Sequence, residues 1–170
     1  MERKIFKIFI IQSFLIGLVC SAALGQRDFD KKLKSLYKNT VPLIRDEALV
    51  TTIHKEKVIL LDTRSSEEFN VSHIPNSLFL DYDSFRPEDV KGLDRNSKIV
   101  VYCSVGYRSE RIGEQLLKLG FKDVSNLYGG IFDWVNDGNK VVNRSEVATD
   151  SVHTYNKEWS KWLQRGVKIY

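Results

Sequence analysis

The chain has 170 residues, 42% hydrophobic and 28% charged, a composition typical of one globular domain with a buried core. Three prolines, ten glycines and the lack of an internal repeat argue against a disordered or repeat protein. The net charge of +4 falls to +2 once Arg3, Lys4, Lys7 and Glu2 of the first 25 residues are set aside. The remaining charges are mixed in sign and form no basic stripe, so nucleic acid is not expected as a partner.

Residues 1–25 are predicted to be a cleaved export signal. A basic start is followed by the apolar run Ile8–Leu18, and Ala23–Gly25 supplies the small residues that signal peptidase requires. The alternatives are a retained membrane anchor, for which the run is short, and a lipoprotein through Cys20, which lacks a small residue before it. We therefore expect a periplasmic or secreted monomer without stable membrane association after cleavage.

The cysteine count becomes informative once the signal is removed. Cys20 leaves with the signal, so Cys103 is the single thiol of the expected mature chain and no intramolecular disulfide is possible. An unpaired cysteine in an exported protein indicates a reactive thiol or an intermolecular partner.

The remaining chain alternates between strand and helix patterns. In chain order we predict a lead-in helix over residues 26–39, a turn and a short edge strand within Asn39–Ile44, and a helix over Asp46–His54. A buried strand over Val58–Asp62 and a helical turn capped by Ser65 come next. A short apolar segment over Ser77–Leu80, a buried strand over Ile99–Tyr102, a helix over Arg108–Leu119, a strand over Val124–Leu127, and a short helix after Gly129-Gly130 follow. This alternation predicts an α/β domain over residues 40–138, with a mainly parallel central sheet flanked by helices on both faces.

Residues 139–170 are predicted to be a C-terminal extension. Trp159, Trp162 and Leu163 form an apolar helical face, which we expect to dock on the domain rather than on a partner.

Cys103 is the candidate nucleophile because it ends a buried strand and precedes a glycine-containing loop. Ligands of parallel sheets bind at the carboxyl ends of strands, and a helix N-terminus there stabilises negative charge on sulfur. Gly106 permits positive φ and an inward turn of N–H groups, Arg108 adds a cation, and Ser109 is expected to cap the following helix. The alternative is a buried cysteine that only fills the core.

Three motifs in this order resemble the single-domain rhodaneses, a family of sulfurtransferases. Cys103-Ser104-Val105-Gly106-Tyr107-Arg108-Ser109 is similar to the active loop C-x-x-G-x-R-S. The stretch Leu61–Phe69 and the turn His73–Ser77 resemble the box D-x-R…E-F…H-I-P-G-A, with Asn76-Ser77 in place of Gly-Ala. Leu127–Trp134 is similar to the terminal G-G-x-x-x-W, so the resemblance covers about residues 40–138.

The resemblance implies a two-step sulfur transfer through Cys103. The thiolate takes the outer sulfur of thiosulfate, polysulfide or a persulfide donor, and a thiol, a protein thiol among the candidates, or cyanide then removes it. The persulfide anion is expected to be held by the loop that contains Ser104, Val105, Gly106, Tyr107, Arg108 and Ser109. Because this loop is largely neutral, we expect modest activity with thiosulfate, and better use of polysulfide or a protein persulfide.

The other polar residues of the motifs are assigned structural positions. Asp62 and Arg64 are expected to form an internal pair near the site, with His73 in a structural turn. Glu67 and Glu68 are expected at an exposed helix start, where one of them pairs with Arg64. No cofactor is predicted, and no metal site, because His54 and His153 lack partners at ligand spacing.

Two other functions remain open. The first is phosphatase or arsenate reductase chemistry, because proteins of a related fold with these activities also present a cysteine followed by an arginine. The phosphatases resemble C-x₅-R, whereas Cys103 to Arg108 is C-x₄-R, one residue shorter. A rhodanese-like module that only binds partners or carries a persulfide is the non-enzymatic alternative.

Overall fold

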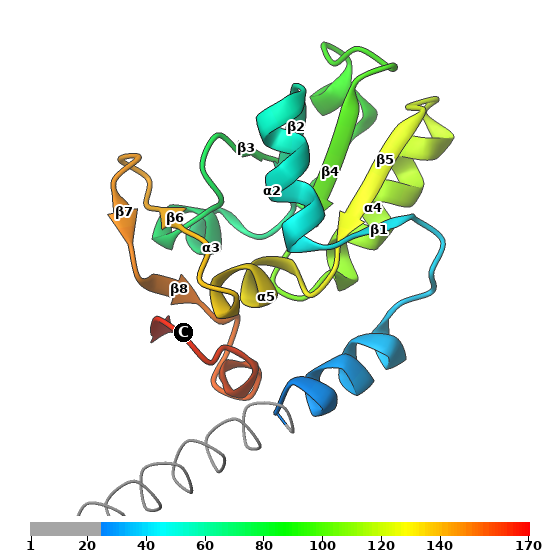
Figure 1. Ribbon diagram of the computed structural model, residues 1–170. Helices are drawn as coiled ribbons and strands as arrows, with labels where there is room; N and C mark the ends of the chain where they lie inside the picture. Colours follow the sequence, from blue (N-terminus) through cyan, green and yellow to red (C-terminus); the bar gives the residue numbers. More distant parts are fainter. Residues whose placement is uncertain (1–24) are drawn as a thin grey trace, which may run out of the picture. The chain divides into compact units, whose positions relative to one another are not determined.

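The computed structural model describes residues 25–170, which Figure 1 colours along the sequence. The predicted export signal and Cys20 lie outside the described residues, apart from Gly25. Residues 25–36 are helical, close to the predicted lead-in helix. The chain divides into two units, one ending at Ser35 and one covering Leu36–Tyr170. Within residues 25–170, no helix has the length and hydrophobicity needed to cross a bilayer.

The second unit is built on a five-stranded parallel sheet in the order β1-β5-β4-β2-β3. The strands are β1 (Leu43–Ile44), β2 (Val58–Asp62), β3 (Leu78–Phe79), β4 (Lys98–Tyr102) and β5 (Asp123–Leu127). β4 lies between β2 and β5, and its residues Ile99–Tyr102 are buried, as expected for a strand covered on both faces. The two-residue strand β1 lies at the edge, as predicted for the segment containing Pro42.

Helices cover both faces of this sheet, which confirms the predicted α/β fold. The helical elements are α2 (Asp46–Lys55), α3 (Ser66–Val71), the 3₁₀ helix η1 (Pro87–Val90), α4 (Tyr107–Lys118) and α5 (Gly130–Asn136). Figure 1 shows α2 in front of the sheet and α4 behind it. The face under α4 holds the main apolar cluster, in which Ile112 and Leu116 pack with Ile99 and Val101 of β4.

Parallel pairing sets the position of the candidate nucleophile. Asp62, the last residue of β2, is paired with Tyr102, the last residue of β4. The residues that follow both strands therefore lie at the same edge of the sheet. Cys103 comes directly after Tyr102 at this edge.

The C-terminal extension differs from the predicted apolar helix. It contains β6 (Val141–Val142), β7 (Ala148–Thr149), β8 (Ser151–His153), the four-residue 3₁₀ helix η2 (Trp159–Trp162) and β9 (Val167–Ile169). Leu163 is buried, but the spacing of Trp159, Trp162 and Leu163 is satisfied by a single 3₁₀ turn. The chain then turns at Gly166 with φ +87° and pairs β9 in parallel with β8, so a longer helix cannot form.

Candidate active site

The loop between β4 and α4 wraps around the sulfur of Cys103. The Gly106 N–H donates a hydrogen bond to Cys103 Sγ at 3.1 Å. Gly106 has φ +90°, as predicted, and a Cβ at this position would lie 2.3 Å from the Tyr37 hydroxyl oxygen. Tyr107 and Arg108 begin α4, where the first N–H groups of a helix have no intrahelical acceptor. The loop therefore presents backbone donors and a helix N-terminus to the sulfur.

Tyr37 fixes the middle of this loop, a role that the sequence analysis missed. Its hydroxyl donates to the Val105 carbonyl at 2.7 Å and accepts from the Gly129 N–H at 2.9 Å. Burial raises the pKa of Tyr37 well above its ordinary value, with a smaller contribution from the neighbouring Cys103. The hydroxyl thus stays protonated and able to donate. The only sequence signal was a tyrosine, not a phenylalanine, on an apolar helix face.

The start of α5 holds the beginning of the same loop. The N–H of Ile131 donates to the Cys103 carbonyl at 2.9 Å, and that of Phe132 donates to the Ser104 carbonyl at 3.2 Å. Gly130 has φ +58°, and a Cβ there would lie 2.3 Å from the Cys103 carbonyl oxygen. The lack of a side chain at Gly130 therefore allows α5 to approach the loop closely.

Arg108 is held by a buried carboxylate. Its two terminal nitrogens bind the two oxygens of Glu68, each at 2.8 Å, and the Ser104 hydroxyl donates to Glu68 Oε1 at 2.8 Å. The Glu68 side chain is only 2% exposed. The prediction of an exposed glutamate that pairs with Arg64 was therefore wrong for Glu68.

Local geometry explains why Glu68 points inward. It occupies the third position of α3, where it forms a reciprocal capping box with Ser65. This agrees with the predicted capping of the helical turn by Ser65. Burial opposes ionisation of Glu68, but the hydrogen bonds and charge of Arg108 outweigh it and lower the pKa to about 2. The capped, ionised glutamate neutralises Arg108.

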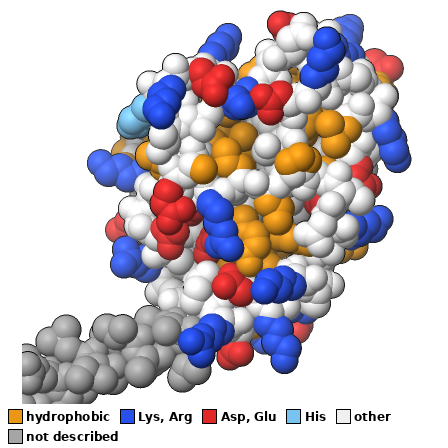
Figure 2. All heavy atoms as spheres, turned by 45° about the vertical axis from the view of Figure 1, so that its right-hand side comes forward, with side chains coloured by type: hydrophobic (Ala, Val, Ile, Leu, Met, Phe, Trp, Pro, Cys, Tyr) orange, Lys and Arg blue, Asp and Glu red, His pale blue; other side chains and the backbone are white. Residues whose placement is uncertain are grey.

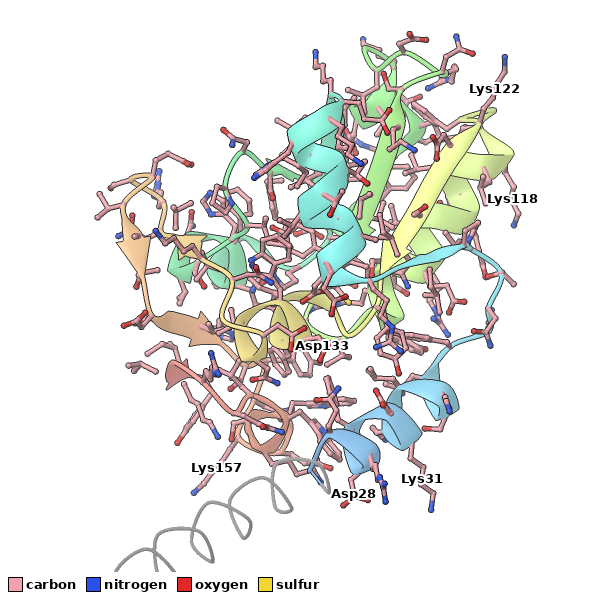
Figure 3. All side chains as sticks on the ribbon, viewed as in Figure 1. Asp28, Lys31, Lys118, Lys122, Asp133 and Lys157 are labelled. Carbon is pink, nitrogen blue, oxygen red and sulfur yellow. The ribbon has the colours of Figure 1, made fainter. Side chains whose placement is uncertain are left out.

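Arg108 also lies beside the sulfur of Cys103. Burial acts to lower the pKa of Arg108, but Glu68 and the neighbouring Cys103 raise it above its ordinary value. Arg108 therefore carries its positive charge close to both the thiol and the buried carboxylate. Figure 3 shows Lys118 and Lys122 near the opposite end of α4, so these two cations are remote from the loop.

Ser109 does not cap α4 as predicted. Gly106 is the N-cap residue, and Ser109, three positions later, faces β5. The Ser109 hydroxyl donates to Asn126 Oδ1 at 2.7 Å, while Asn126 Nδ2 donates to the Gly106 carbonyl at 3.0 Å. Ser109 and Asn126 thus hold the loop against β5. Asn126 is a second residue whose role the sequence did not predict.

Asp62, Arg64 and His73 lie in structural networks beside the loop. Asp62 and Arg64 form a fully buried ion pair with an O···N distance of 2.6 Å, and Arg64 also donates to the Ser72 carbonyl at 2.5 Å. The ring nitrogens of His73 contact the Phe69 carbonyl and Glu146 Oε1, each at 3.0 Å. None of these three side chains lines the pocket at Cys103.

A pocket of about 350 Å³ opens over the loop. Its lining residues come from four segments and are mainly aromatic or apolar: Leu36, Tyr82, Asp83, Cys103, Ser104, Val105, Tyr107, Arg108, Tyr155 and Trp159. Cys103 itself is only 1% exposed, so a substrate must enter the pocket to reach the sulfur. Within residues 25–170, no group of three or more His, Cys, Asp or Glu side chains is arranged to hold a metal ion.

The surface outside this pocket carries both signs of charge. Figure 2 shows acidic and basic side chains interspersed over one face, with hydrophobic side chains gathered between them. That face has no continuous patch of a single sign.

Comparison with protein families places the central part of the chain. Residues 46–137, more than half of the chain, match the family described as Rhodanese-like domain. Two curated relatives are named tRNA uridine(34) hydroxylase. The protein from Cytophaga hutchinsonii is 37% identical over 84 residues, covering 47% of this chain and 27% of the relative. That from Buchnera aphidicola is 33% identical over 102 residues, covering 57% of this chain and 32% of the relative. The chain thus spans about a third of the length of these relatives.

Solved structures give the same fold. A rhodanese-related protein from Thermoplasma volcanium is 31% identical with a TM-score of 0.54, and the match covers 59% of this chain and 97% of that protein. A rhodanese-like domain protein from Staphylococcus aureus is 26% identical with a TM-score of 0.54, covering 61% of this chain and 98% of that protein.

Proposed function

The chain belongs to the rhodanese-like domain family, and from this premise we propose that it is a sulfurtransferase that carries sulfur on Cys103. The observation that carries the proposal is the thiol at the base of a pocket, with the Gly106 N–H on its sulfur and Arg108 beside it. This arrangement suits a sulfur anion that alternates between thiolate and persulfide.

The proposed reaction has two steps that conserve atoms and electrons. In the first, the Cys103 thiolate attacks the outer sulfur of a donor such as thiosulfate, and the donor's S–S bond breaks, releasing sulfite with the electron pair. In the second, an acceptor thiolate attacks the outer sulfur of the Cys103 persulfide, and the pair returns to Cys103 Sγ. The acceptor leaves as a persulfide, and its thiol proton has gone to solvent.

Sulfur is favoured over phosphate by the size of the loop and the partner of its arginine. Four residues separate Cys103 from Arg108, and the Gly106 N–H within this short loop lies 3.1 Å from the sulfur. A phosphate-binding arginine would present its terminal nitrogens to the anion, but both nitrogens of Arg108 bind Glu68.

Production of thiocyanate from cyanide and a sulfur donor tests the proposal. The wild-type protein is expected to turn over with polysulfide and, more slowly, with thiosulfate, whereas Cys103→Ala is expected to lose turnover entirely. Val147→Ala, an exposed apolar change distant in sequence from the loop, is the matched control and keeps wild-type rates. Phosphate release from an aryl phosphate by the wild type, without thiocyanate formation, would instead favour phosphatase chemistry.

The names of the curated relatives suggest a second candidate, hydroxylation of a tRNA uridine. It is supported by identities of 33–37% over 84–102 residues that cover only part of each relative. Nucleoside analysis of tRNA from cells that lack or overproduce this protein tests it. A change in hydroxylated uridine that depends on Cys103 would favour this candidate over general sulfur transfer.

We also propose that the protein is exported, on the strength of the N-terminal sequence alone. The pattern supports cleavage after Gly25. N-terminal sequencing of the protein from fractionated cells tests this, with Gln26 expected as the first residue of the periplasmic or secreted form. Recovery of the intact N-terminus in the cytoplasmic fraction would contradict it.

A further inference from the structure

The C-terminal extension contributes two aromatic side chains to the pocket over Cys103. Tyr155 lies between β8 and η2, and Trp159 is the first residue of η2. Both line the pocket together with the sulfur, although they follow the family-matched segment 46–137. Part of the substrate pocket is therefore built by a segment outside that match.

This aromatic wall is held by defined contacts. The buried Thr154 donates its N–H to the Ile169 carbonyl of β9 at 2.7 Å, and the Trp159 N–H donates to Asn156 Oδ1 at 3.1 Å. Tyr155 itself has φ +64°, a left-handed conformation that is uncommon for a bulky residue. Strained backbone of this kind is often retained at ligand-binding sites, where the surrounding structure fixes it.

The charges around the sulfur disfavour an acceptor that carries negative charge beyond its reacting thiolate. The charged residues that line the pocket are Asp83 and Arg108, and the Arg108 guanidinium is bound by the carboxylate of Glu68. One cation is thus balanced against two carboxylates, and a persulfide on Cys103 would add another negative charge. The Arg108 Cζ also lies 5.5 Å from the centre of the Tyr155 ring, within the range of a cation–π interaction.

We propose that Tyr155 and Trp159 select a sulfur acceptor whose thiol is carried on an uncharged aromatic group. This inference rests on the proposed sulfurtransferase function and names the acceptor class of the same site. The aromatic carrier packs against Tyr155 and Trp159 while its thiolate reaches the outer sulfur of the Cys103 persulfide. The S–S bond of the persulfide breaks, its electron pair stays on Cys103, and the aromatic thiol leaves as a persulfide.

Single-turnover discharge of preloaded protein tests this selectivity. Protein loaded with sulfur is mixed with benzyl mercaptan, with 4-(mercaptomethyl)benzoate, which is its para-carboxylate derivative, or with 2-mercaptoethanol. Loss of the sulfane sulfur from Cys103 is followed by the intact mass of the protein. Rates are compared at equal thiolate concentration. Because the benzyl ring packs against two aromatic side chains, benzyl mercaptan should react about tenfold faster than 2-mercaptoethanol. The para-carboxylate should be slower than benzyl mercaptan.

Two variants and one control make the test specific. Trp159→Ala removes one ring, and Tyr155→Asn removes the other while keeping a residue that tolerates left-handed backbone. Each should reduce the preference for benzyl mercaptan over 2-mercaptoethanol to about threefold or less. Tyr170→Ala removes an exposed aromatic of the same extension that does not line the pocket, and should keep the wild-type preference.

The outcomes separate this inference from the function on which it rests. Normal loading of Cys103 with no aromatic preference, or with the same preference in both variants, overturns the inference and leaves the sulfurtransferase function standing. Faster discharge by the para-carboxylate than by benzyl mercaptan also overturns it. Failure of the wild type to load sulfur overturns the proposed function and the inference together.

Discussion

The loop of residues 103–109 and the aromatic wall formed by Tyr155 and Trp159 line the same pocket, but they are held in different ways. The loop is fixed by buried polar contacts from Tyr37, Glu68, Asn126 and α5. Tyr155 in the wall is 58% exposed, and its segment is held mainly by backbone pairing of short strands. A change in the loop must disturb several buried partners, whereas a change in the wall alters little beyond the pocket. This difference suggests that the loop carries the chemistry and the wall carries the selectivity.

Gly106→Ala is the change expected to reduce sulfur transfer most. It forces a side chain onto a backbone with φ +90° and brings Cβ to 2.3 Å from the Tyr37 oxygen, so the loop must move. A displacement of about 1 Å at a reacting group costs on the order of 10²-fold in rate. Stopped-flow loading from polysulfide measures the effect.

Gly92→Ala is the matched control, because a Cβ at Gly92 has no atom within 4 Å and φ there is not positive. It should load at the wild-type rate. Near-normal loading by Gly106→Ala would show that the loop is not as constrained as its contacts imply.

Glu68→Gln is expected to have the next largest effect on transfer. It leaves Arg108 without its carboxylate partner, and breaking a buried pair costs about 3–5 kcal/mol of folding stability. The freed guanidinium should attract anions, so the rate with thiosulfate relative to polysulfide should rise several-fold. Donor-dependent loading rates and urea unfolding measure both. An unchanged donor ratio would contradict neutralisation of Arg108 by Glu68.

The same residue predicts acid sensitivity of the fold. The folded-state pKa of Glu68 is lowered from 4.5 to about 2, so its stabilising contribution is present above pH 4.5 and is lost as the pH falls toward 2. Unfolding measured between pH 5 and 2 should show this loss in the wild type. The loss should be smaller in Glu68→Gln, and an identical pH dependence of the two proteins would argue against this origin.

Tyr37→Phe should weaken transfer by a few-fold only. It removes the hydroxyl that joins the Val105 carbonyl to the Gly129 N–H, and leaving such buried groups unsatisfied costs about 1–3 kcal/mol. Urea unfolding and loading kinetics measure the two effects. Tyr170→Phe, at an exposed position, is the control and should change neither.

Asp46→Asn is expected to leave sulfur transfer unchanged and to alter stability alone. Asp46 is the first residue of α2, and both its carboxyl oxygens are buried without a hydrogen-bond partner within the described residues. Burial, followed by the charges of Asp133 and Asp137, raises its pKa from 3.8 to about 7. Figure 3 places Asp133 on α5.

The pH dependence of Asp46 has the opposite sign to that of Glu68. Because its pKa is raised on folding, wild-type stability should fall as the pH rises from 3.8 toward 7. The asparagine variant should therefore melt at a higher temperature than wild type above pH 7, with a smaller difference near pH 4. A variant that melts lower at pH 8 would contradict an unpaired buried carboxylate.

Local patterns predicted the sheet and the loop well. The apolar runs of β2 and β4, the Ser65–Glu68 capping box and the positive φ of Gly106 depend on neighbours close in sequence. The spacing of residues along the chain was therefore enough to predict these elements.

Long-range pairs were not predictable in this way. The Glu68–Arg108 pair spans 40 positions and the Tyr37–Val105 bond spans 68. Both depend on how α3 and the segment before β1 are placed against the loop between β4 and α4. The prediction of an apolar helix in the C-terminal extension was wrong for a different reason. The spacing of Trp159, Trp162 and Leu163 fits one turn of a 3₁₀ helix as well as it fits an α-helix.

Intact-mass measurement through one full cycle tests the central claim most directly. In Cys20→Ser protein, Cys103 is the sole thiol of the sequence. The mass should rise by one sulfur, about 32 Da, after polysulfide and return to its starting value after an acceptor thiol. Cys103→Ala in the same background should show neither change. A folded Cys20→Ser protein whose mass never rises, or an equal rise in the Cys103→Ala protein, would contradict sulfur transfer through Cys103.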